Sequence, residues 1–224
     1  SFLLSALKLS SRAELVHINH PHLAPLGLIL RTLSPRIKYS VSTHGIDAWT
    51  RLPLVRRLGL RSADWITAPS QCTADRLSKA QAIDRTKVAV IPWGIDLDSL
   101  RQEEAKRPLS KLPRGKILLT VARLEASERF KRVEEVIAAM PAVLAAVPDA
   151  YYVIVGDGSE RSRFERQAQE LGISKHVVFT GICSDLVLAQ HYNACDVFIM
   201  LSSKEGFGLV FVEAMAFAWL AREA

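Results

Sequence analysis

The stretch that most constrains the fold of this chain lies near its C-terminal end. Residues 197–201 form an apolar run with the composition of a strand buried in a parallel sheet. A helix is predicted after Gly208, because apolar side chains recur there at the spacing of one helix face: Leu209, Val212, Ala216 and Leu220. A strand, a short turn and a helix in this order predict an α/β fold that binds ligands at the carboxyl ends of its strands.

The turn between this strand and this helix carries two glycines and an acid. Gly206 and Gly208 allow a ligand to approach the backbone closely, and the start of the helix offers unpaired N–H groups to a phosphate. Glu205 lies in the turn and Glu213 about a turn and a half into the helix, so both carboxylates are expected at one crevice. Taken alone, the spacing favours a simpler explanation, which is an acid near a helix start and a solvated glutamate.

Charge is distributed unevenly along the 224 residues. The net charge is +6, with +8 in residues 1–112 and −2 in residues 113–224. A basic first half favours an anionic partner, namely a membrane surface, a phosphorylated acceptor or nucleic acid, and a solvated basic face explains it equally well. No apolar stretch has the length of a membrane span, and three widely spaced cysteines indicate reduced thiols in a cytosolic protein.

Strand-like and helix-like segments alternate along the whole chain. Strands are predicted at residues 14–19, 37–43, 64–68, 87–91, 116–121, 151–155, 177–179 and 197–201, with helices between most of them. This alternation predicts parallel sheets with right-handed crossovers. The polar stretch 100–114 is the predicted linker between two Rossmann-like domains, residues 1–107 and residues 108–224.

Two cations follow the first strand of the second half. Arg123 lies on the loop after residues 116–121, and Lys131 lies at the start of the next predicted helix. Arginine and lysine are usually exposed, so two solvated cations are the simple explanation. Their position beside the Glu205 turn favours instead a clamp on a diphosphate, in which the arginine binds with two N–H groups and the lysine acts as a point charge.

Three further motifs have residues that could take part in chemistry or ligand binding. His44 ends the strand at residues 37–43, at the carboxyl edge where ligands bind. Asp96-Leu97-Asp98 has the D-x-D pattern of a metal-diphosphate site, but it lies in a loop beside the linker, so a turn is favoured and no metal is predicted. Gly156-Asp157-Gly158 lacks the third glycine of a dinucleotide fingerprint and is predicted to be a tight turn that is still able to line a nucleotide pocket.

Several segments, in the same order along the chain, resemble those of glycosyltransferase family 4, whose members are retaining enzymes of the GT-B fold. Residues 41–47 resemble the segment whose histidine faces the donor sugar, and residues 90–96 resemble V-I-P-N-G-I-D with Trp93 in place of the asparagine. The remaining matches are residues 121–124 to V-G-R-L, 128–131 to E-R-Y-K, 155–158, 179–181 and 194–197, and the E-x7-E motif of residues 205–213. Any one segment is weak evidence, but the ordered series is specific.

The resemblance implies two Rossmann-like domains whose parallel sheets face a cleft. It also implies hexose transfer from a nucleotide diphosphate sugar to a saccharide or lipid-linked acceptor, with the leaving phosphate helping to deprotonate the acceptor. Arg123 and Lys131 would then contact the diphosphate, Glu205 the hexose hydroxyls, Glu213 the ribose and His44 the sugar. The implied donor site also includes Gly156, Gly181, Gly206, Phe207 and Gly208. The only implied co-substrate is the donor, with no cofactor and no metal.

The sequence also departs from the family pattern. The family's N-terminal glycine-rich loop and the strands after the E-x7-E motif are not found, and Arg132 stands where the family usually has glycine. The chain is therefore expected to be an internal fragment with both domains incomplete and with doubtful activity of its own. A non-catalytic nucleotide-sugar-binding or interaction module stays open as the alternative. The expected location is the cytoplasm, with peripheral contact to the inner face of an anionic membrane and no nucleic-acid partner.

Overall fold

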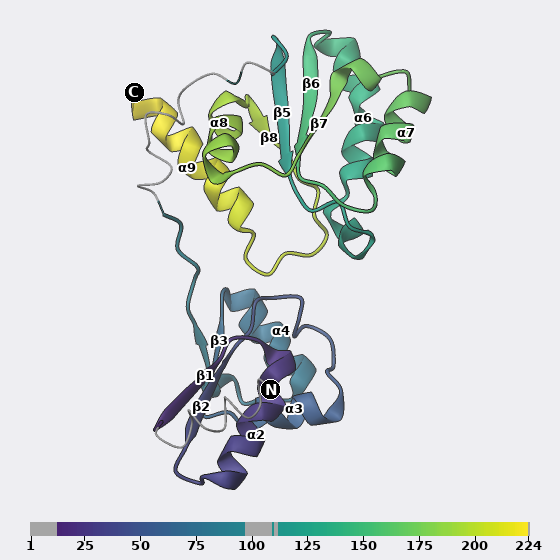
Figure 1. The fold of residues 1–224 in the computed structure, drawn as a ribbon. Helices are drawn as coiled ribbons and strands as arrows, with labels where there is room; N and C mark the ends of the chain where they lie inside the picture. Colours follow the sequence, from purple (N-terminus) through teal and green to yellow (C-terminus); the bar gives the residue numbers. More distant parts are fainter. Residues whose placement is uncertain (1–12, 97–108, 110–111, 224) are drawn as a thin grey trace. The chain divides into compact units, whose positions relative to one another are not determined.

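The computed structural model of this chain describes residues 13–96, 109 and 112–223. These residues form two compact units, each built on a four-stranded parallel sheet (Figure 1). Unit 1 contains the described residues up to Gly94 together with Glu205–Phe207, and unit 2 contains the other described residues. The α/β prediction with two parallel sheets is thus confirmed, whereas the predicted boundary between residues 107 and 108 lies outside the described residues and stays a prediction.

Unit 1 carries four parallel strands in sequential order. They are β1 (Leu15–Ile18), β2 (Lys38–Ser42), β3 (Trp65–Ala68) and β4 (Val88–Val90). The connecting helices are η1 (Pro21–Leu23), α2 (Ala24–Leu33), α3 (Leu54–Arg61), α4 (Gln71–Gln81) and η2 (Arg85–Lys87). Each connection returns the chain to the neighbouring parallel strand, as the alternation of strands and helices predicts.

The helices of unit 1 pack on one face of its sheet. Tyr39 and Val41 of β2 are fully buried in an apolar cluster to which α2, α3 and α4 all contribute. The Tyr39 hydroxyl donates to the carbonyl oxygen of Gly59 at 2.6 Å, which ties β2 to α3. Ser40 and Ser42, the alternate residues of β2, are only partly buried, so this alternation fixes which face of the strand meets the core.

Unit 2 has the strand order β7-β6-β5-β8. Its strands are β5 (Lys116–Val121), β6 (Ala150–Val155), β7 (Val177–Gly181) and β8 (Val197–Phe198). Its helices are η4 (Ala126–Lys131), α6 (Val133–Ala146), α7 (Arg161–Glu170), η5 (Ser174–His176), α8 (Asp185–Ala194) and α9 (Leu209–Glu223). The chain moves outward from β5 through β6 to β7 and then returns to the other side of β5, and such a reversal of strand order places a crevice at the carboxyl ends of the central strands.

Two apolar layers cover the sheet of unit 2. Tyr152 and Ile154 of β6 face α6 and α7, and Leu119 and Val153 face α8 and α9 (Figure 1). All four side chains are fully buried. Central strands covered on both faces need continuous apolar sequence, and this explains why β5 and β6 were predicted nearly to the residue.

Most predicted strands differ from the structure by one or two residues at an end, and the strand at residues 197–201 differs more. In unit 1, α3 begins only at Leu54, because Pro53 precedes it with ψ 146° and so stands outside the helix. The strand predicted at residues 197–201 is reduced to β8, and Val197 is 50% exposed. Among the described residues β8 pairs with β5 alone, so its apolar run does not reflect burial between two neighbouring strands.

Candidate functional site

The carboxyl ends of the unit 2 strands bring several predicted site residues to one edge of the sheet. Arg123 follows β5, Gly156 follows β6, and Gly181 ends β7. Because these strands are parallel, their carboxyl ends lie along the same edge. Three residues from well-separated parts of the sequence thus share the edge at which α/β sheets bind ligands.

The loops at this edge are joined by backbone hydrogen bonds. The N–H of Gly156 donates to the carbonyl of Gly181 at 2.9 Å, and the N–H of Leu124 donates to the carbonyl of Asp157 at 2.9 Å. Gly156 has φ +133°, and a Cβ at this position would overlap the carbonyl oxygen of Ala122. The glycine is therefore required by the backbone, whereas donor contacts by Gly156 and Gly181 stay predictions.

Arg123 has a carboxylate partner of its own. Its side chain is 80% exposed and forms an ion pair with Glu128, which is only 10% exposed. Glu128 belongs to η4, so the pair holds the Arg123 guanidinium beside the element that ends at Lys131. The exposed guanidinium of Arg123 presents N–H groups to solvent, where they are available to a phosphate.

The η4 segment is anchored to α7 through a buried acid. Glu160 accepts from Arg129 at 2.8 Å and from Arg163 at 2.6 Å. The hydrogen bonds from these two guanidinium groups hold the pKa of Glu160 below its usual value, so the acid is ionised at neutral pH. Such an anchor limits the movement of the loop that carries Lys131.

Arg132 occupies a backbone position that favours glycine. It has φ 55° and ψ 43° in the left-handed region, between η4 and α6. A non-glycine residue in this region costs about 1–2 kcal/mol. The glycine expected at this position in the family therefore has a conformational reason, and the arginine is accommodated at a cost.

The segment before Glu205 lies against η4. The N–H of Ser203 donates to the carbonyl of Phe130 at 2.8 Å, within unit 2. Phe130 immediately precedes Lys131, so the loop between β8 and α9 passes the predicted cationic clamp. No sequence pattern indicated this contact, because it joins two backbone groups 73 positions apart.

The loop between β8 and α9 carries the remaining donor-site predictions. Glu205, Gly206 and Phe207 are all half-buried, and these three residues belong to unit 1. Gly208 is buried with φ +78°, a conformation that glycine adopts without strain, and its carbonyl accepts from the N–H of Phe211 in the first turn of α9. The predicted strand-turn-helix is therefore present, and the ligand contacts of Glu205, Gly206 and Phe207 stay predictions.

Glu213 lies on α9 and has a partner that the sequence did not reveal. The hydroxyl of Tyr192 on α8 lies 2.8 Å from Oε2 of Glu213. Tyr192 is 4% exposed, and burial together with the adjacent carboxylate raises its pKa. The phenol therefore stays protonated and donates to Glu213.

His44 lies in unit 1, directly after β2. Its Nε2 lies 2.8 Å from the carbonyl oxygen of Asn19 and donates a hydrogen bond to it. Its backbone N–H donates to the Asp47 carboxylate at 3.2 Å, and its ring stacks on His20 with centroids 5.8 Å apart. The tautomer and orientation of the ring are thus fixed by its own neighbours.

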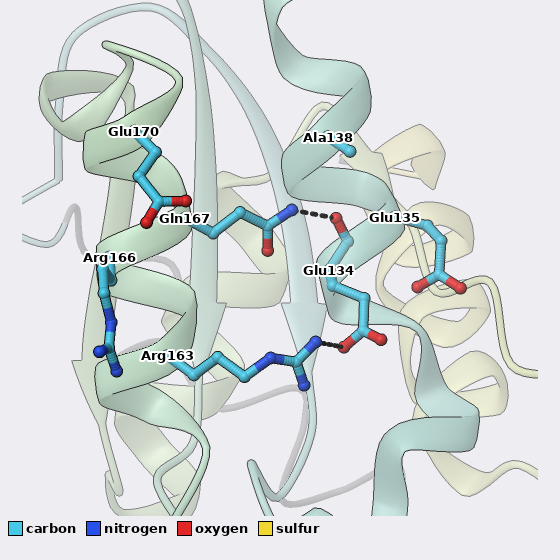
Figure 2. Close-up of a pocket in the computed structure, with 7 residues that line it drawn as sticks. All are labelled: Glu134, Glu135, Ala138, Arg163, Arg166, Gln167 and Glu170. Atoms are coloured by element: carbon cyan, nitrogen blue, oxygen red, sulfur yellow. Dashed lines mark hydrogen bonds and ion pairs between the residues drawn. The ribbon is translucent and has the colours of Figure 1, made fainter.

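A groove between α6 and α7 has a volume of about 490 Å³ (Figure 2). Across it Arg163 forms an ion pair with Glu134 at 2.9 Å, and the Gln167 amide donates to the Glu134 carbonyl at 2.9 Å. The complete lining is Glu134, Glu135, Ala138, Arg163, Arg166, Gln167 and Glu170. None of these is a predicted site residue. The groove carries both acidic and basic side chains, so its charge favours neither anionic nor cationic ligands.

A metal site would need several convergent side-chain ligands. No group of three or more histidine, cysteine, aspartate or glutamate side chains with suitable geometry occurs in this part of the chain. Of the D-x-D triplet, Asp96 is described and exposed, whereas Leu97 and Asp98 lie outside the described residues.

The sequence matches two families of known proteins. The family described as "Glycosyl transferases group 1" matches residues 101–220, and "Glycosyltransferase Family 4" matches residues 1–99. The GDP-mannose-dependent alpha-(1-6)-phosphatidylinositol monomannoside mannosyltransferase of Mycobacterium tuberculosis is 31% identical over 211 residues, 86% of this chain and 54% of that protein. Alpha-monoglucosyldiacylglycerol synthase of Streptococcus pneumoniae is 31% identical over 165 residues, 70% of this chain and 36% of that protein. The chain thus spans about a third to a half of the length of these relatives.

Solved structures share the fold at low sequence identity. The structure of Anabaena Alr3699/HepE in complex with UDP-glucose has a TM-score of 0.78 and 20% identity, and the match covers 96% of this chain and 60% of that one. Sucrose-phosphate synthase from Thermosynechococcus elongatus has a TM-score of 0.77 and 24% identity, with coverage of 96% and 57%. These likenesses confirm the predicted GT-B fold.

Proposed function

This chain belongs to the family of glycosyl transferases group 1, and on that premise we propose that the protein transfers a hexose from a nucleotide diphosphate sugar to an acceptor with retention of the anomeric configuration. The observation that carries the proposal is the single sheet edge at which Arg123, Gly156 and Gly181 follow parallel strands. Such an edge, at a reversal of strand order, is where α/β sheets bind nucleotides. Relatives that use nucleotide sugars, such as the GDP-mannose-dependent enzyme, support the same assignment.

Each predicted residue has a role in this proposal. Arg123 and Lys131 offset the charge that grows on the leaving diphosphate, and the backbone of Gly206, Phe207 and Gly208 assists them. Glu205 accepts hydrogen bonds from the hexose hydroxyls, and Glu213 accepts those of the ribose. His44 orients the sugar, at its 6-hydroxyl, and the leaving phosphate takes the acceptor proton. The nucleotide diphosphate sugar is the co-substrate, and no cofactor takes part.

The test of this function is donor binding by an Arg123→Ala variant. A charge-assisted hydrogen bond contributes about 1.5–3 kcal/mol, so the dissociation constant for UDP or GDP is expected to rise about tenfold or more. Arg166→Ala is the matched control, because it removes an exposed arginine of the same unit from the α6–α7 groove. Calorimetry that finds unchanged affinity in folded Arg123→Ala would refute the clamp. Donor binding without any sugar transfer would support the binding-module alternative.

The proposed reaction uses no divalent metal. Arg123 and Lys131 supply the positive charge that a metal supplies to a diphosphate in D-x-D enzymes. Sugar transfer by the natural protein is expected to keep its full rate in an excess of chelator. Activity that disappears with the chelator and returns with magnesium or manganese would contradict this assignment.

We also propose peripheral contact with an anionic membrane surface through α3. Leu54 and Val55 at the start of α3 are 60% and 61% exposed, and Arg51 before the helix and Arg61 at its end are exposed as well. The part of the chain that the structure describes contains no helix that could span a bilayer. The names of two relatives include a lipid, diacylglycerol in one and phosphatidylinositol in the other, which supports a lipid-linked acceptor.

Vesicle sedimentation tests the membrane contact. Each basic residue near an anionic surface contributes about 1 kcal/mol, so Arg51→Ala/Arg61→Ala is expected to weaken binding to anionic vesicles roughly tenfold or more. Arg114→Ala/Lys175→Ala removes the same charge from exposed positions of unit 2 and serves as the control. Binding that is equal on neutral vesicles, or equal in both double variants, would leave only a solvated basic face.

A further inference from the structure

Tyr192 joins the helices α8 and α9. It lies near the end of α8, and its hydroxyl reaches Oε2 of Glu213 on α9 at 2.8 Å and the carbonyl of Val210 at 3.4 Å. The two helices lie side by side on one face of the unit 2 sheet (Figure 1). Oε2 of Glu213 is therefore held by a donor on a neighbouring helix.

The Tyr192 ring has little freedom to move. It stacks on the Phe217 ring, with the ring centroids 5.3 Å apart and the ring planes 14° apart. The centroid of the Phe198 ring lies 5.9 Å from that of Tyr192, in a tilted arrangement. The residue is 4% exposed. Aromatic neighbours on two sides fix the direction of its hydroxyl, so the hydrogen bond to Glu213 starts from a rigid donor.

A carboxylate that accepts a hydrogen bond at one oxygen can still accept hydrogen bonds at its other oxygen. A glutamate side chain loses considerable rotational entropy when a ligand fixes it, and a hydrogen bond made before the ligand arrives removes part of that loss. Tyr192 occupies Oε2, and Oε1 keeps its lone pairs for hydroxyl donors. A pair of vicinal hydroxyls on a ribose has the donors that such an oxygen accepts.

We propose that Tyr192 is a positioning residue for the donor, which holds Glu213 so that its free oxygen accepts the ribose hydroxyls of the nucleotide. This inference rests on the proposed function, because Glu213 is the proposed ribose ligand. Tyr192 itself does not touch the donor. Its effect is confined to recognition of the ribose and leaves the transfer step unchanged.

Tyr192→Phe tests the proposal, because it removes the hydroxyl and keeps the ring stack. Calorimetry would compare UDP and GDP with their 2′,3′-dideoxy analogues in the natural protein and in the variant. The preference for the ribonucleotide is expected to fall roughly three- to tenfold in Tyr192→Phe. In steady-state kinetics KM for the donor should rise by a similar factor, whereas kcat should stay the same.

Tyr152→Phe is the matched control. Tyr152 is also fully buried, and its hydroxyl donates at 2.8 Å to Thr120, a neutral partner in the core under α6. Its loss should lower stability without changing the preference for the ribose. Should Tyr192→Phe fail to fold, Glu213→Asp on the half-buried face of α9 withdraws the carboxylate from Tyr192 and should lose the same preference.

The outcomes separate this proposal from the proposed function. A natural protein that binds neither UDP nor GDP overturns both. A natural protein that prefers the ribonucleotide, with an undiminished preference in folded Tyr192→Phe, overturns only the role of Tyr192. An undiminished preference in Glu213→Asp overturns the assignment of Glu213 to the ribose and the role of Tyr192 with it. A preference lost in Tyr192→Phe and kept in Tyr152→Phe supports it.

Discussion

Replacing Glu205 by glutamine is expected to lower kcat about 100-fold and to leave KM for the donor nearly unchanged. The substitution keeps the shape of the side chain and replaces one acceptor oxygen by a donor. If the hydrogen bonds from the hexose hydroxyls strengthen as positive charge develops on the sugar, their loss raises the transition state and not the bound ground state. The measurement is steady-state kinetics of the natural protein and the variant with the same donor.

Glu213→Gln is the control variant for Glu205→Gln, because the same chemical change is expected to affect a different kinetic constant. Glu213 is proposed to bind the ribose equally in the ground and transition states, so its substitution should raise KM for the donor about tenfold with little change in kcat. The two variants differ from the natural protein by the same chemical change at positions eight residues apart. Normal turnover by Glu205→Gln would remove its catalytic role, and the motif would reduce to an acid before a helix beside a nucleotide-binding glutamate.

The parts of the fold that sequence reasoning predicted well are those with a strong local pattern. β5 was predicted at residues 116–121, and β6 was predicted one residue short of its start at Ala150. Both are central strands covered by helices on two faces, so nearly every side chain is apolar and the pattern is continuous. The prediction for β8 was too long, because an apolar run does not reveal at which residue the strand stops pairing with its neighbour, here β5.

The contacts that build the candidate site were mostly invisible in the sequence. Arg123 was identified, but its partner Glu128 was not, and Tyr192 was missed altogether although it holds Glu213. Local patterns indicate which face of a helix is buried, whereas partners on a neighbouring helix depend on how far each helix slides and rotates in packing. One signal was available for Tyr192, since a buried tyrosine hydroxyl usually finds a polar partner.

Gly156→Ala is expected to lower the free energy of unfolding by about 3 kcal/mol, because it combines backbone strain with a clash. Gly156 has φ +133°, and an added Cβ would overlap the carbonyl oxygen of Ala122 and lie 2.9 Å from its carbonyl carbon. Ala122 cannot retreat freely, since its N–H donates to the carbonyl of Val155 at 3.0 Å and holds β5 beside β6. Relief of the clash therefore costs hydrogen bonds of the central strands.

Gly172→Ala separates the two causes within the same unit. Gly172 has φ +70°, and nothing lies within 4 Å of the position that its Cβ would take. Only the conformational strain remains there, so the expected loss is about 1 kcal/mol. Urea unfolding of both variants without ligand, followed by far-UV circular dichroism, gives the two free energies directly. An equal loss of unfolding free energy in both variants would mean that the loops after β5 and β6 move to accommodate the added methyl group. The close approach of Gly156 to the Ala122 carbonyl would then be needed for ligand binding and not for stability.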